Sequence, residues 1–224
     1  MHKIDKTNLE FLAKLEIHNN REWFDEHKSE FKVHQKQVKT VFEDLYGSLN
    51  SHDVIDRFKM FRIYRDVRFS KNKLSYKTHF AASYHRKKPE LRGGYYIQVK
   101  PNNQSFIATG FWNPEKKDLF RIRKEFEQDD QEIRDIINSS LFKSVWGNKQ
   151  GDELKTAPRN FDKNHHAIDL IRRKQFIFTK TFSDEEVLKA DFIERVNESF
   201  IAIRPFFNYM SDVLTTDLNG QSLL

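Results

Sequence analysis

The chain has 224 residues, of which 38% are hydrophobic and 21 are Phe, enough bulky apolar volume for one sizeable core. It contains no cysteine, which excludes disulfides, thiolate metal sites and a thiol nucleophile. The first residues lack the apolar core of a signal peptide, and no apolar run is long enough to cross a bilayer. We therefore expect a cytoplasmic protein without a membrane partner.

The net charge of +6 is concentrated in the middle of the chain. Residues 57–92 contain twelve Lys or Arg but only two carboxylates, Asp66 and Glu90, whereas the rest of the chain has an excess of carboxylates. A basic region of this kind implies either an anionic partner or carboxylates that arrive from elsewhere in the fold.

The first 50 residues are predicted to be helical. Apolar side chains recur at helical spacing over residues 7–50. Thr7 is the expected N-cap of the first helix, and Asn19 with Glu22 three residues later resembles a capping box for the next. Gly47 is expected to mark the end of the long helix that follows.

Residues 58–112 are predicted to form mainly strands. The segment 61–69, FRIYRDVRF, alternates with the period of two that is typical of a strand. Gly93 and Gly94 supply one of the short turns between successive strands. Short connections between consecutive strands favour an antiparallel sheet.

Residues 113–216 are predicted to contain helices, a loop and one further strand. Asn113 and Pro114 are the expected N-cap and first residue of a helix, and QFIFTKTF is the expected strand. The predicted fold class is α+β, with an antiparallel sheet from the middle of the chain packed against N-terminal and C-terminal helices. We expect a single domain over residues 1–224, because the chain contains no repeat and no linker.

The predicted strand 61–69 and the loop after it form the strongest candidate site. Arg62, Asp66 and Arg68 project from one face, where a carboxylate between two guanidiniums would leave donors free for an oxyanion. Alternatively, this face is solvated and its charges pair internally, because edge strands often carry Lys and Arg. The predicted ligand-binding residues are Arg62, Arg68, Ser70, Lys71, Lys73, Tyr76, Lys77 and Arg159.

Arg65 lies on the otherwise apolar side of the same predicted strand. A guanidinium in that position must be paired or must reach solvent. We expect Arg65 to form a structural ion pair with a carboxylate of the second helix, either Glu22 or Asp25.

Catalytic and metal chemistry have weaker support in the sequence. If the protein is an enzyme, Asp66 and His165 are the candidates for proton transfer. His165 and Asp169 would share one face of a helix, but His166 would point elsewhere, so we expect no metal site. The residues identify no particular cofactor.

Four segments together resemble one known family. They are NNREWFDEHK at 19–28, FRIYRDVRFSKNKLSYKTHFAA at 61–82, the Gly-Phe-Trp-Asn-Pro junction and LKTAPRNFDKNHHAIDLI at 154–171. The family is the group of bacterial conserved hypothetical proteins catalogued as domain of unknown function 2461, and the resemblance implies no reaction. The chain departs from the family pattern at Asn72, Ser75, Asn160 and His166, where Asp, Pro, Gly and Pro are usual. Positions that follow the pattern are Asn20, Trp23, Arg62, Arg65, Asp66, Arg68, Ser70, Lys71, Lys73, Tyr76, Lys77, Pro158, Arg159, Asp162 and His165.

Three functions stay open at this point. The first is binding, with or without turnover, of a phosphate-bearing or other anionic ligand at the strand 61–69 and the following loop. The second is a nucleic-acid-binding module that uses the basic region 57–92. The third is a scaffold or interaction protein whose basic strand is paired internally. The sequence leaves the oligomeric state open.

Overall fold

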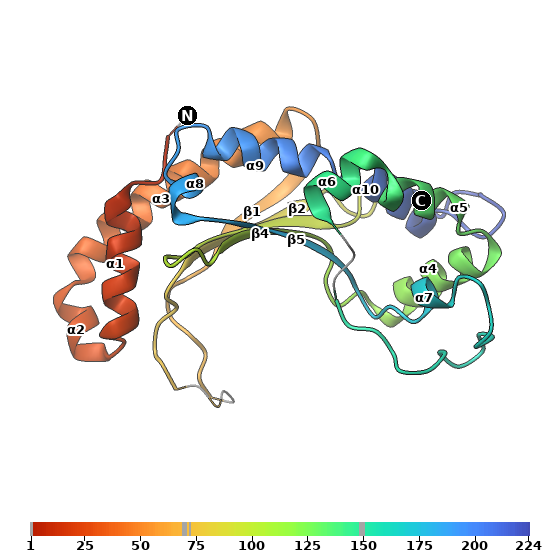
Figure 1. The fold of residues 1–224 in the computed structure, drawn as a ribbon, viewed down its shortest axis with the longest axis horizontal. Coiled ribbons are helices and arrows are strands. Elements are labelled where there is room, and N and C mark those ends of the chain that lie inside the picture. Colours follow the sequence, from red (N-terminus) through yellow and green to blue (C-terminus); the bar gives the residue numbers. More distant parts are fainter. Residues whose placement is uncertain (1, 69–70, 72, 148–150) are drawn as a thin grey trace. The chain divides into compact units, whose positions relative to one another are not determined.

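The computed structural model describes residues 2–68, 71, 73–147 and 151–224 (Figure 1). It confirms the α+β class, with a five-stranded antiparallel sheet from the middle of the chain in the order β1-β2-β3-β4-β5. The strands are β1 Ile55–Met60, β2 Phe80–Arg86, β3 Gly94–Val99, β4 Ser105–Phe111 and β5 Phe176–Phe182. The helices are α1 Lys6–Ile17, α2 Arg21–Glu26, α3 Lys28–Asn50, α4 Lys116–Gln128, α5 Gln131–Asn138, α6 Ser140–Trp146, α7 Ile168–Ile171, α8 Asp184–Val187, α9 Phe192–Ile201 and α10 Arg204–Thr215.

The chain divides into two compact units. Unit 1 comprises Met1–Tyr84, Tyr96–Ile107 and Thr181–Glu198, and unit 2 comprises His85–Tyr95, Ala108–Lys180 and Ser199–Leu224. Strands β2 to β5 each contribute residues to both units. The expectation of a single domain over residues 1–224 therefore stays a prediction. No helix in the described ranges is both long enough and apolar enough to cross a membrane.

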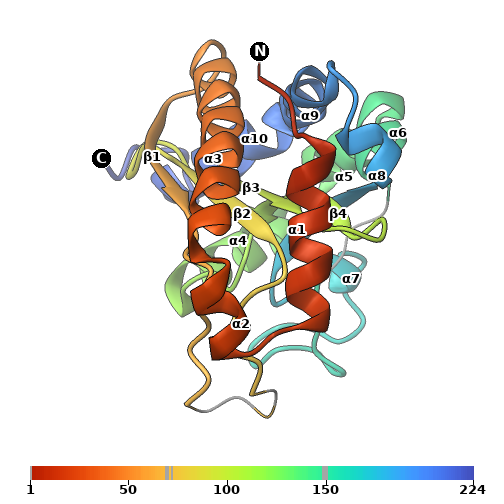
Figure 2. The same cartoon turned by 90° about the vertical axis from the view of Figure 1, so that its left-hand side faces the viewer.

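In unit 1 the long helix α3 covers one face of strands β1 and β2, and α1 lies beside α3 (Figure 2). The Tyr84 hydroxyl, fully buried, donates to the carbonyl oxygen of Phe42 on α3 at 2.9 Å. The Phe58 ring on β1 lies between Tyr46 of α3 and Tyr84, with ring centres 5.9 and 5.3 Å apart. Residues that alternate with Phe58 and Tyr84 therefore face the other side of the sheet.

Several predicted helix boundaries are wrong. The first helix is capped by Asp5, whose carboxylate accepts from the backbone of Thr7, and it begins one residue before Thr7. The second is capped by Asn20 and not by Asn19. The long helix continues past Gly47 to Asn50. In each case a neighbouring polar residue, or the packing of the helix, overrides the local signal.

Strands β4 and β5 approach each other closely in unit 2 at Gly110. Gly110 on β4 has φ 120°, in the region that favours glycine, and its α carbon lies against the carbonyl of Phe176 on β5. A side chain at this position would collide with that carbonyl oxygen. The glycine before the predicted Phe-Trp-Asn-Pro junction is thus required by strand packing, as expected where another backbone approaches closely.

Candidate anion-binding site

The basic segment after β1 is not the predicted strand. Strand β1 ends at Met60, and the chain continues as an irregular antiparallel pair that leaves the sheet (Figure 1). We call residues 61–79 the arm. Within it, Arg65 N donates to Ser75 O at 3.0 Å, and Tyr64 and Tyr76 form the one isolated β-bridge among the arm residues that the structure describes. The side chains nevertheless alternate between buried and exposed as predicted, because Ile63 is buried while its neighbours Arg62 and Tyr64 are exposed.

Two extra residues interrupt the pairing at the base of the arm. Phe61 N donates to Ala81 O at 2.9 Å, and Lys77 N donates to Ile63 O at 2.8 Å. Between these two hydrogen bonds, one side of the arm advances by two residues, from Phe61 to Ile63, and the other side advances by four, from Lys77 to Ala81. Such a bulge re-aims side chains and ends regular pairing. It explains both why the predicted strand fails and why consecutive side chains from 76 to 79 line one pocket.

That pocket, which we call the arm pocket, has a volume of about 450 Å³. It is built entirely within unit 1, from the end of α1, the arm and the residue after β3. A regular strand would send half of the arm residues to the opposite face. The lining residues are Glu16, Arg65, Leu74, Tyr76, Lys77, Thr78, His79 and Lys100.

The lining carries three cations, Arg65, Lys77 and Lys100, but one carboxylate, Glu16. Lys100 Nζ lies 3.6 Å from Glu16 Oε1. Within the described part of the chain, neither Arg65 nor Lys77 forms an ion pair. The predicted ion pair of Arg65 with Glu22 or Asp25 is therefore wrong. Arg21 lies 3.7 Å from Asp25 instead, and Arg65 faces the pocket.

Burial and the neighbouring positive charges act on two titratable groups here. Burial, followed by the charges of Lys77, Lys100 and Arg65, lowers the pKa of His79 from 6.5 to about 4. Burial and the neighbouring Arg62, Lys59 and Arg65 also lower the pKa of Lys77. At pH 7 the His79 imidazole is neutral and can donate or accept a hydrogen bond. An anion in the pocket would relieve the repulsion that acts on both groups.

Asn19 holds the arm in place. Its side-chain amide donates to Tyr76 O at 3.0 Å, and its side-chain oxygen accepts from Tyr76 N, also at 3.0 Å. The Asn19 side chain thus forms hydrogen bonds with both the N–H and the C=O of Tyr76, as the backbone of a neighbouring strand would. The Tyr76 ring stacks on Phe24 of α2, with ring centres 4.0 Å apart. The residue predicted as a helix cap is an anchor for the pocket wall.

Asn19→Ala and Asn20→Ala form a matched test of that anchor. We expect each to lower the free energy of unfolding, Asn19→Ala by about 1–3 kcal/mol and Asn20→Ala, which removes the cap of α2, by about 1 kcal/mol. Only Asn19→Ala should speed amide hydrogen exchange over residues 75–79, by about tenfold, because it alone frees Tyr76. Equal exchange in the two variants would show that Asn19 does not fix the arm.

The other predicted residues of the segment lie away from the pocket. Arg68 binds Asp66 in bidentate fashion, with Nε–Oδ1 and NH2–Oδ2 distances of 3.0 and 2.7 Å, and both side chains are exposed. This hydrogen bonding from Arg68 lowers the pKa of Asp66, which makes Asp66 a weaker base. Lys73 Nζ donates to Val67 O at 3.1 Å, and Lys71 is exposed. Ser70 lies outside the described residues.

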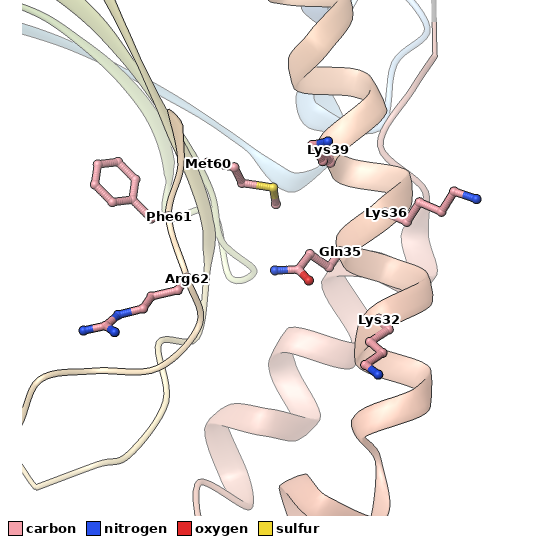
Figure 3. Close-up of a pocket in the computed structure, with 7 residues that line it drawn as sticks. All are labelled: Lys32, Gln35, Lys36, Lys39, Met60, Phe61 and Arg62. Carbon is pink, nitrogen blue, oxygen red and sulfur yellow. The ribbon is translucent and has the colours of Figure 1, made fainter. Parts of the chain in front are cut away.

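Arg62 lines a second hollow, of about 580 Å³, between α3 and the start of the arm (Figure 3). In Figure 3 the side chains of Met60 and Gln35 point toward each other across it. Arg62 and Phe61 point away from α3. The cations around this hollow therefore do not converge on one point, and we prefer the arm pocket as the candidate site. The residues that line the second hollow are Lys32, Gln35, Lys36, Lys39, Met60, Phe61 and Arg62.

Arg159 and His165 belong to unit 2, whereas the arm pocket belongs to unit 1. Arg159 is exposed. His165 Nδ1 accepts from Ala167 N at 3.2 Å. Its neighbour His166 lies beside the carboxylate of Asp130, with Nε2 and Oδ1 3.1 Å apart.

Across the described ranges, no group of three or more His, Cys, Asp or Glu side chains is arranged to hold a metal ion.

One departure from the family pattern has a structural explanation. Asn160, where glycine is usual, has φ 69°. This is the left-handed region, which asparagine tolerates better than other residues with a side chain. Asparagine therefore preserves the backbone conformation at this position.

The sequence did not single out Arg65, His79, Lys100 or Glu16 as site residues. The sequence predicts a structural ion pair for Arg65, although the place of Arg65 on an apolar side is itself a signal of an unusual environment. Lys100 and Glu16 reach the pocket through strand pairing and helix packing, which no local pattern encodes.

The structure thus combines an α+β fold with a pocket at the base of an irregular arm whose lining carries three cations. The chain belongs to the family described as conserved hypothetical protein, DUF2461, whose model matches residues 7–209. This match confirms the family resemblance of the four sequence segments. No curated protein and no solved structure matches the chain.

Proposed function

We propose that the protein binds a phosphate-bearing or similar anionic ligand in the arm pocket. The observation that carries the proposal is the convergence of Arg65, Lys77 and Lys100 on a hollow with a single carboxylate. Guanidinium and ammonium groups are the usual partners of phosphate, and neutral His79 adds a hydrogen-bonding group. Asp66 lies outside the pocket and His165 belongs to the other unit, so neither residue is assigned a role in turnover.

The ion pairs of the arm favour this proposal over a scaffold whose basic residues are all paired internally. Besides Arg62, the predicted strand 61–69 carries two arginines, Arg65 and Arg68, of which only Arg68 has a carboxylate partner among the described residues. Arg65 and Lys77 hold their charges half-buried without one. Half-buried unpaired cations cost stability, which is a reason to connect them with a ligand.

Calorimetric titration with pyrophosphate tests the proposal. We expect binding to the wild type and a loss of affinity of about tenfold to a hundredfold in Lys77→Gln, because one charged hydrogen bond is removed. Lys6→Gln is the matched control, with the same change of charge on the exposed first turn of α1, about 15 Å along the helix from Glu16. No binding to the wild type, or equal losses in the two variants, would refute the proposal.

Two further expectations stay proposals, namely a bacterial source and a location in the cytoplasm. They are supported by the family resemblance and by a sequence without cysteine, which needs no oxidising compartment.

A further inference from the structure

A row of aromatic side chains lies next to the arm pocket. The row consists of Phe61, Tyr96 and Phe106, which come from the start of the arm, β3 and β4. The ring centres of Phe61 and Tyr96 are 6.0 Å apart, and those of Tyr96 and Phe106 are 5.5 Å apart. Three rings within contact distance form a continuous apolar strip of unit 1.

The row is not part of the buried core. Along β3 and β4, Ile97 and Ile107 are fully buried, whereas Tyr96 and Phe106 are half-buried. Phe61 is half-buried too. Because side chains alternate along a strand, these rings are on the face opposite the buried positions. Parts of their surfaces are therefore available to a ligand.

Lysines connect the row to the arm pocket. Lys77 Nζ lies 5.2 Å from the centre of the Phe61 ring, and Lys77 also lines the pocket. Lys59 Nζ lies 5.7 Å from the same ring centre. Within the described residues, neither lysine forms an ion pair. An anionic group held at Lys77 would thus be adjacent to an aromatic surface.

Nucleoside phosphates combine the two chemistries that meet here, an anionic group and a planar ring. Bases stack on protein aromatic rings with little dependence on sequence, and lysines beside such rings track the phosphates. We infer that the ligand of the arm pocket is a nucleoside phosphate whose base stacks on the row of Phe61, Tyr96 and Phe106. This inference rests on the proposed function, since it assigns the ring to the row and the phosphate to the pocket.

Comparison of ADP with pyrophosphate tests the inference, because both carry a diphosphate. We expect the wild type to bind ADP about tenfold more tightly than pyrophosphate, the gain of one stacked base. Phe61→Leu and Tyr96→Leu should each remove most of that gain and leave pyrophosphate affinity within about twofold. Phe120→Leu is the control, since Phe120 is exposed and has Lys124 Nζ 5.9 Å from its ring centre but is outside the row.

The outcomes separate the two proposals. Pyrophosphate binding with no preference for ADP would overturn the inference and leave the proposed function standing. An equal loss of the ADP preference in Phe120→Leu would also overturn it. Absence of binding by either compound would overturn both. A phosphorylated ten-residue thymidine oligonucleotide distinguishes the source: tighter, strongly salt-dependent binding would indicate a nucleic-acid strand, and affinity no greater than that of ADP would indicate a free nucleotide.

Discussion

The ring of His79 is expected to titrate near pH 4 in the free protein and at least one pH unit higher when pyrophosphate is bound. Burial and the cations Lys77, Lys100 and Arg65 lower its pKa to about 4, and a bound anion would offset those charges. The titration can be followed by NMR of the imidazole with and without ligand. A pKa near 6.5 in the free protein would show that His79 is not buried beside these cations.

The same shift makes stability depend on pH in a defined direction. The folded-state pKa of His79, about 4, is below the ordinary value of 6.5, so the unfolded chain binds more protons between these two values. Lowering the pH from 6.5 to 4 therefore favours unfolding through this group, whereas above pH 6.5 the group contributes nothing. In His79→Gln this part of the dependence should vanish, and urea denaturation of both proteins at pH 7 and pH 5 measures it.

Anion binding and protonation of His79 are then coupled. An anion that raises the pKa of His79 must bind more tightly when His79 is protonated. We expect pyrophosphate to bind the wild type more tightly at pH 5 than at pH 7, after correction for the ligand's own ionisation. The variant His79→Gln should lack this difference. A pH dependence of affinity that is unchanged in the variant would show that His79 is not the coupled group.

Gly110→Ala is expected to destabilise the protein by about 3 kcal/mol or more. Two costs add at this position. The backbone has φ 120°, which residues with a side chain rarely adopt, and the new Cβ would collide with the carbonyl oxygen of Phe176. That carbonyl belongs to strand β5 and cannot move without disturbing the sheet.

Gly47→Ala is the matched control for Gly110→Ala. Gly47 is inside α3, and a Cβ there would meet nothing within 4 Å. The same substitution should therefore stabilise the protein by about 0.5–1 kcal/mol, because alanine is the better helix former. Urea denaturation of both variants measures the contrast. A mild effect of Gly110→Ala would mean that β4 and β5 do not approach each other this closely.

The sequence predicted the features that depend on local periodicity. The helical spacing before Asn50 and the alternation in the middle of the chain led to the correct α+β class and to an antiparallel sheet. The alternation over 61–69 also predicted which side chains are exposed, since Arg62 and Asp66 are exposed and Ile63 is buried. These patterns reflect contacts between each residue and a single surface, which a short window of sequence encodes.

The candidate site could be predicted only in part. Tyr76 and Lys77 line the arm pocket as members of the predicted set, but Arg68 pairs outward with Asp66. Arg65 and Lys100 belong to the pocket through the bulge and through the place of β3 beside the arm. Pairing registers of this kind depend on distant segments, so residue types and spacing along one strand do not determine them.

The bulge at the base of the arm also has a consequence for how the pocket can be lost. A hairpin shorter by its two extra residues would restore regular alternation and would divide the side chains from Tyr76 to His79 between the two faces. The pocket would then disappear although every lysine and arginine was retained. The number of residues between Lys77 and Ala81 is thus as much a determinant of the pocket as the charges that line it, and a deletion there would act like the removal of several side chains at once.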